Sequence, residues 1–85
     1  MLDAAGNRRW ALFRTRDQVI DAVLEHYVNW RERAAATRFA YDRFTIAATR
    51  IERAAAFAAF TETLNEEQLA AEEYENSLAY AERVL

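Results

Sequence analysis

The chain has 85 residues, of which 53% are hydrophobic and 29% charged, and its formal net charge is −3. It contains one Gly, no Pro and no Cys. A single small domain fits this length, and the lack of Cys excludes disulfide scaffolds, cysteine-rich zinc folds and thiol nucleophiles. The sequence has no apolar run of about 18 residues that would span a membrane. The N-terminus does not resemble a signal peptide, so we expect a cytoplasmic protein.

The composition favours helices throughout. Nineteen residues are Ala and all eleven basic residues are Arg, while the two strongest helix breakers, Gly and Pro, are nearly missing. The alternating pattern of β-branched residues that marks strands is absent. The sequence therefore predicts an all-α protein.

Charge is unevenly distributed along the chain. Residues 1–53 hold ten Arg against seven acidic residues, a net charge of +3, whereas residues 54–85 hold one Arg against seven, a net charge of −6. Two halves of opposite sign attract each other, which favours a chain that folds back on itself.

Residues 1–14 are expected to form a basic and aromatic arm that is partly disordered. Its basic and aromatic side chains extend to the start of the first helix and are the candidates for contacting nucleic acid or a partner protein: Arg8, Arg9, Trp10, Phe13, Arg14 and Arg16. The overall negative charge argues against nucleic acid. We favour an arm whose Trp10 and Phe13 cover the open end of the helices.

A first helix is predicted over residues 15–47. Thr15 is its expected N-cap, because Gln18 three residues later completes a capping box. Apolar residues then recur every three or four positions as a heptad seam, with Thr37 as the only polar member: Ile20, Val23, Tyr27, Trp30, Ala34, Thr37, Tyr41, Phe44 and Ala48.

A second helix is predicted over residues 50–84. Thr49 and Glu52 repeat the capping-box pattern, although no Gly or Pro marks the turn before them. The alternative is one continuous helix of about 70 residues, some 100 Å long. A second heptad run, interrupted only by Glu67, favours the hairpin: Phe57, Phe60, Leu64, Glu67, Ala71, Tyr74, Leu78, Ala81 and Leu85. Folding back near Ala48 places Arg33 beside Glu66.

A second apolar stripe runs along the first helix, on roughly the opposite side from the seam, and would stay exposed in a monomer. The expected interface residues are Leu24, Val28, Phe39, Ile46, Leu69, Tyr80 and Val84. We therefore expect a coiled-coil-like, antiparallel two-helix hairpin that forms a homodimeric four-helix bundle, or that docks on another protein.

Candidates for catalysis or metal binding are weak. His26 is the only histidine, and the Glu-x-x-His motif of carboxylate bundles is missing because Val23 stands three residues before it. We expect His26 to be an exposed residue at the flank of the seam. The chain also lacks a glycine-rich phosphate loop and a strand–turn element that would present Ser77 as a nucleophile. No catalytic residue, cofactor site or metal ligand is expected.

The function expected from the sequence is that of a non-enzymatic protein–protein interaction module, acting as a homodimer or as a small adaptor or inhibitor. The alternative is a nucleic-acid-associated regulator that uses the arginines and tryptophan of the arm. A carboxylate-bundle metalloprotein is the third and least favoured interpretation.

Overall fold

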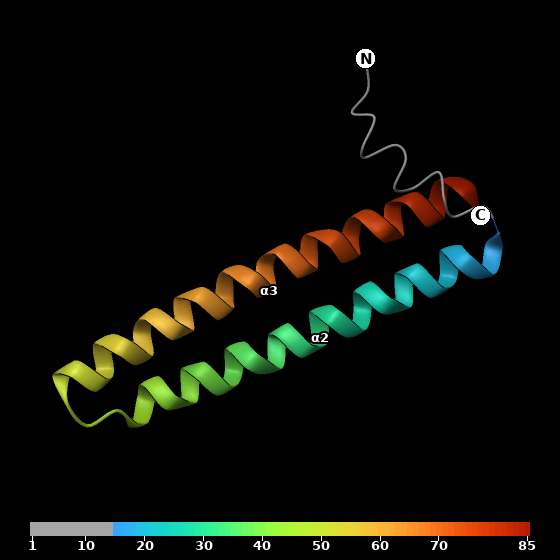
Figure 1. Ribbon diagram of the computed structural model, residues 1–85. Helices are drawn as coiled ribbons and strands as arrows, with labels where there is room; N and C mark the ends of the chain where they lie inside the picture. The colour runs from blue at the N-terminus through green and yellow to red at the C-terminus, as the bar shows by residue number, and fades with distance from the viewer. Residues whose placement is uncertain (1–14) are drawn as a thin grey trace, which may run out of the picture.

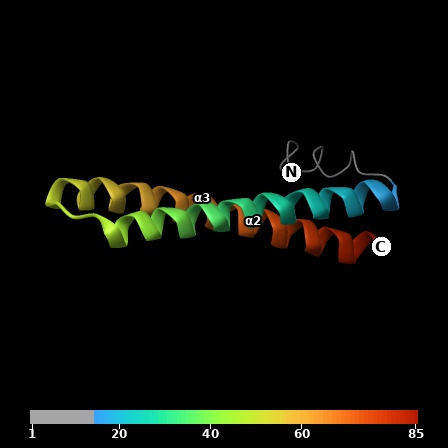
Figure 2. The same ribbon diagram turned by 90° about the horizontal axis from the view of Figure 1, so that it is seen from below.

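The fold is an antiparallel helical hairpin. A computed structural model describes residues 15–85, which form two α-helices, α2 (Arg16–Ile46) and α3 (Arg50–Val84). The start of α2 and the end of α3 lie at the same end of the hairpin (Figure 1). Seen from below, the two helices cross at a shallow angle (Figure 2). The described residues contain no strand, and the all-α hairpin with helices near 15–47 and 50–84 is confirmed.

Both helices begin at the capping boxes expected from the sequence. The backbone N–H of Gln18 donates to Thr15 Oγ1 at 3.1 Å, and the N–H of Thr15 donates to Gln18 Oε1 at 3.2 Å. Thr49 and Glu52 exchange the equivalent bonds, at 3.1 Å and 3.4 Å. Each box satisfies N–H groups that have no partner within the first turn of a helix.

The turn needs no glycine because no residue in it adopts a left-handed conformation. Ala47 has φ −62° and ψ 125°, and Thr49 has φ −105° and ψ 162°. Both values are extended backbone, which any residue adopts. Glu52 stabilises the turn further, since its Oε2 also accepts from the N–H of Ala48 at 3.2 Å. One continuous helix is thereby excluded, because Thr49 starts a new one.

Small side chains lie where the two helices touch, along what we call the contact line. The most deeply buried residues of the described chain, all 8% exposed or less, are Val19, Ala22, Thr37, Ala40, Ala70 and Ser77. Four of these six carry nothing larger than the side chain of Ala or Ser, and helices with such residues at their contact approach closely. The aromatic rings lie beside this line, where those of the two helices contact each other.

The large seam residues contact one another across the hairpin, but the expectation that they are enclosed between the helices was wrong for several of them. Tyr27, Tyr41, Phe57 and Leu64 are exposed, whereas Trp30, Phe44, Phe60 and Tyr74 are half-buried. Buried residues repeatedly stand one position before a predicted seam residue, as Ala22 does before Val23 and Ala40 before Tyr41. One residue corresponds to 100° around a helix, so both helices are rotated relative to the expected register.

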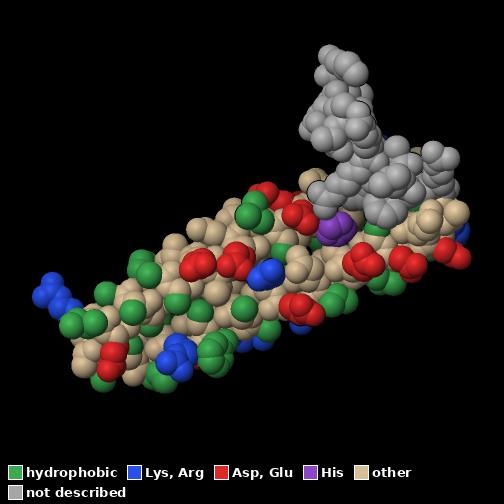
Figure 3. Space-filling model, viewed as in Figure 1, with side chains coloured by type: hydrophobic (Ala, Val, Ile, Leu, Met, Phe, Trp, Pro, Cys, Tyr) green, Lys and Arg blue, Asp and Glu red, His purple; other side chains and the backbone are tan. Residues whose placement is uncertain are grey.

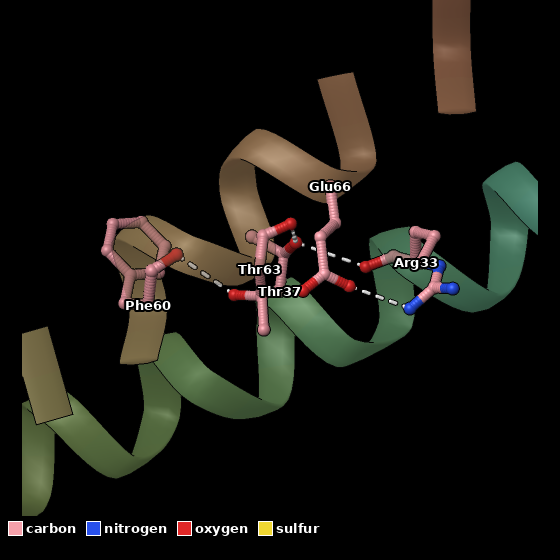
Figure 4. A network of polar contacts seen from close by, with 5 residues as sticks. All are labelled: Arg33, Thr37, Phe60, Thr63 and Glu66. Atoms are coloured by element: carbon pink, nitrogen blue, oxygen red, sulfur yellow. Dashed lines mark hydrogen bonds and ion pairs between the residues drawn. The ribbon is translucent and has the colours of Figure 1, made fainter. Parts of the chain in front are cut away.

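Polar side chains on the contact line are hydrogen-bonded. The hydroxyl of Thr37 lies 3.0 Å from the carbonyl oxygen of Arg33 and 3.0 Å from that of Thr63 on α3 (Figure 4). Thr63 donates in turn to the carbonyl of Phe60 at 2.9 Å, and Ser77 donates to that of Tyr74 at 2.7 Å. Over residues 15–85 no buried side-chain nitrogen or oxygen is left without a partner, as stable packing requires.

Candidate interaction surfaces

One side of the hairpin carries the aromatic rings of both helices. Tyr27 contacts Tyr74 with ring centroids 5.5 Å apart, and Trp30 stacks on Tyr74 at 5.6 Å with an interplanar angle of 13°. Nearer the turn, Tyr41 meets Phe60 at 5.5 Å and Phe44 meets Phe57 at 5.7 Å. These edge-on and stacked contacts are typical of packed aromatic clusters. We call this side the aromatic face, and it comprises Tyr27, Trp30, Tyr41, Phe44, Phe57, Phe60, Leu64 and Tyr74.

The rings of the aromatic face are only partly buried by the partner helix. Tyr27 is 40% exposed, Tyr41 50% and Phe57 54%. The face runs along about half of each helix, from Tyr27 and Tyr74 in the open half to Phe44 and Phe57 near the turn. An exposed apolar surface that continues over two helices is typical of an interface.

The opposite side of the hairpin is charged in its open half. His26 Nδ1 lies 3.5 Å from Glu73 Oε2, and Arg33 Nη1 lies 2.7 Å from Glu66 Oε2. His26 and Glu73 stand one position before Tyr27 and Tyr74, which contact each other. The pair of His26 and Glu73 therefore lies on one flank of the contact line, and the pair of Tyr27 and Tyr74 lies on the other. Figure 3 looks onto this charged side, with the histidine in purple among red carboxylates. The expected pairing of Arg33 with Glu66 is confirmed.

His26 is more enclosed than the sequence suggested. Its side chain is only 18% exposed and faces Glu73 across the hairpin, so the expectation of a surface-exposed histidine was wrong. The rotation of α2 that buries Ala22 and Ala40 also turns His26 toward α3. Residues 15–85 contain no group of three His, Cys, Asp or Glu side chains arranged to hold a metal ion.

The four expected interface residues of the first helix form a stripe on the side of α2 that faces away from α3. We call it the outer stripe, and it comprises Leu24, Val28, Phe39 and Ile46, all of them exposed. Arg43 lies over the Phe39 ring, with 6.0 Å between its Cζ and the ring centroid. Leu24 and Val28 border a hollow of about 500 Å³ together with Asp21, Glu25 and Glu32.

Phe39 and Ile46 border a larger groove on the other flank of the contact line from the aromatic face. Its volume is about 890 Å³, and Ala55, Ala56 and Ala59 of α3 form much of its wall. Arg43 and Glu52 also line it, at the end near the turn. Alanine produces this groove because it supplies no side chain long enough to fill the space beside the two helices.

The expected interface residues of the second helix lie on a different surface from the outer stripe. Leu69 and Val84 are exposed, and Tyr80 is half-buried with the Arg83 guanidinium 5.8 Å from its ring centroid. Helical spacing places Leu69 and Tyr80 on the flank of α3 that also carries Glu62 and Glu73. The structure does not join the seven expected interface residues into one patch.

The basic and aromatic arm falls outside the part of the chain that the structure describes, so the predictions for Arg8, Arg9, Trp10, Phe13 and Arg14 stay predictions. Arg16 is the first residue of α2 and is exposed. No helix within residues 15–85 is both long and apolar enough to cross a membrane.

The sequence analysis missed the aromatic face as a surface, because it placed these residues in a closed seam. A signal for the rotation was present. The small residues Ala22, Ala40, Ala70 and Ser77 each stand one position before a residue of the predicted seam. Small residues beside a line of large ones indicate close helix contact with the large residues directed to one side.

Comparison with known proteins adds no relative. The chain matches no protein-family model, no curated protein and no solved structure.

Proposed function

We propose that this protein is a non-enzymatic protein–protein interaction module, which acts as a homodimeric helical bundle or as a small adaptor or inhibitor that docks on another protein. The proposal rests on one observation, the imbalance between what the hairpin buries and what it exposes. The buried hydrophobic residues of the described chain are Val19 and three alanines. Twelve large apolar side chains within the same residues are between 40% and 83% exposed.

Such a hairpin is poorly stabilised on its own. A single core in a chain of this size supplies about 3–5 kcal/mol at best, and a core built mainly from alanine supplies less. Covering the exposed side chains with another polypeptide adds about 25 cal/mol per Å² of apolar surface. Association thus supplies the core that the single chain lacks, and stability and binding become the same process.

The proposal is tested by thermal unfolding, followed by far-ultraviolet circular dichroism over about a hundredfold range of protein concentration. A midpoint that rises with concentration supports a module that binds itself. A monomer that unfolds without cooperativity and binds an apolar fluorescent dye supports one that lacks its partner. A monomer that unfolds cooperatively at one temperature throughout, and does not bind the dye, would overturn the proposal.

A further inference from the structure

We infer that the aromatic face is the dimer interface, covered by the same face of a second copy whose turn lies at the same end of the resulting four-helix bundle. The inference rests on the proposed function and names its partner, its surface and its orientation. It replaces the outer stripe as the place where the copies meet.

The first observation is the rotation of both helices. In an isolated two-stranded coiled coil, the large heptad residues point at the other helix. In a four-helix bundle, each helix directs them toward the centre of the bundle, to one side of its neighbour. Here Tyr41 and Phe60 contact each other on one side, while Ala40 and Thr37 occupy the line between the helices. Each hairpin therefore has the geometry of half a bundle.

The second observation is the size of the face. The longer helix has 35 residues, which corresponds to about 50 Å, and two adjacent helices are about 20 Å wide. The side of the hairpin that carries the face therefore covers about 1,000 Å² in projection. A standard protein interface buries about 800 Å² per partner, so this side of the hairpin is large enough for a stable dimer.

The third observation is the difference in charge between the two helices. Side chains of both signs border the face on each helix, namely Arg31, Arg38 and Asp42 on α2, and Arg50, Arg53, Glu75 and Glu82 on α3. The bordering charges therefore select no orientation by themselves, and the net charge of each helix decides.

The net charges of the two helices select the orientation of the second copy. With both turns at one end, each α2 lies along the α3 of the other copy. With the turns at opposite ends, each α3 would lie along the other α3. The residues Arg50–Val84 carry eight acidic side chains against three arginines, a net charge of −5. Two such helices side by side repel, whereas Arg16–Ile46 has equal numbers of both signs.

The surface is tested by paired substitutions with the molar mass in solution as the readout. The double variant Tyr41→Ala/Phe57→Ala removes two half-exposed rings of the aromatic face. Its matched control, Phe39→Ala/Ile46→Ala, removes two side chains of similar size from the outer stripe. We expect the first to weaken the dimer at least a hundredfold and the second to leave the dimer mass unchanged. The reverse pattern overturns the inference and leaves the proposed function standing.

The orientation is tested by the distance between two spin labels, one on each copy. The chain has no Cys, so a single introduced Cys carries the only label. The label is placed outside the aromatic face so that it does not weaken the interface. Ile51→Cys carries the label on an exposed residue near the turn, on the side of α3 away from the aromatic face. If both turns lie at the same end of the bundle, the two labels are about 20–30 Å apart, including the length of the label side chains. Turns at opposite ends place them about 50 Å apart. The shorter distance is expected, and either the longer distance or the absence of any dipolar coupling overturns the inference.

Discussion

The hydroxyl of Thr37 on α2 donates across the hairpin to the backbone carbonyl of Thr63 on α3, at 3.0 Å. A side chain as short as threonine reaches the main chain of the neighbouring helix only where the two helices are close together. Ala40 on α2 and Ala70 on α3 make the same approach possible, since both are buried and neither fills space between the axes. This close contact directs the large side chains to one side.

Enlarging a residue on the contact line should separate the helices. We expect Ala70→Leu to lower the free energy of unfolding by about 1–3 kcal/mol, because a buried alanine site has no space for three additional carbon atoms. Urea unfolding at fixed protein concentration measures the change. Ala58→Leu is the control on the same helix, where the side chain is exposed. Equal stability of the two variants would mean that the contact line is not tightly packed.

Removing the cap of α3 should destabilise the hairpin at its turn. Thr49→Ala deletes the oxygen that accepts from the Glu52 N–H, and we expect a loss of about 1 kcal/mol. Thr61→Ala is a matched control, since the Thr61 hydroxyl bonds only to the carbonyl of Phe57 within the same helix. Thermal unfolding compares them at equal concentration. A Thr49→Ala protein as stable as the control would show that the turn forms without its capping box.

The ion pair between Arg33 and Glu66 should contribute little. Both side chains are more than 40% exposed, and exposed pairs are worth about 0.2–1 kcal/mol. A double-mutant cycle with Arg33→Ala and Glu66→Ala measures the coupling, which we expect to fall further in 1 M salt because the pair is screened. A coupling energy above about 2 kcal/mol, or one insensitive to salt, would contradict this account of an exposed pair.

Glu67 is expected to weaken the inferred dimer interface. It stands seven residues from both Phe60 and Tyr74, hence on the aromatic face, and it is half-buried. In the inferred bundle the Glu67 side chains of the two copies meet at the same height, where like charges repel. We expect Glu67→Leu to tighten the dimer about tenfold, which corresponds to about 1.4 kcal/mol.

The control for this substitution is Glu62→Leu, which removes the same charge from an exposed position of α3 on the flank away from the aromatic face. Sedimentation equilibrium measures both dissociation constants. If Glu62→Leu tightens the dimer as much as Glu67→Leu does, the effect comes from net charge and not from the interface.

Local signals predicted the helices and their ends accurately. The boxes at Thr15 and Thr49 act within four residues, so the sequence alone shows where each helix begins. The ion pair of Arg33 and Glu66 also followed from folding the chain back near Ala48. The rotation of the helices did not follow, because it depends on the distance between them. That distance is fixed by Ala22, Ala40 and Ala70 acting together across the hairpin, which a heptad pattern in each helix separately does not report.

The same rotation explains the two errors at the candidate site. His26 was expected in solvent and lies toward Glu73, while Tyr27 and Tyr41 were expected between the helices and lie half-exposed beside them. The outer stripe was recognised as exposed, and it is. The sequence alone did not show that the hairpin exposes a second apolar surface, the aromatic face.

The most direct test of the central claim, that this hairpin completes its core with a second copy of itself, is the molar mass of the unmodified protein by light scattering on a sizing column. The account predicts a mass twice that of the 9.9 kDa chain, held over about a hundredfold range of concentration. A folded species of 9.9 kDa throughout that range would contradict it.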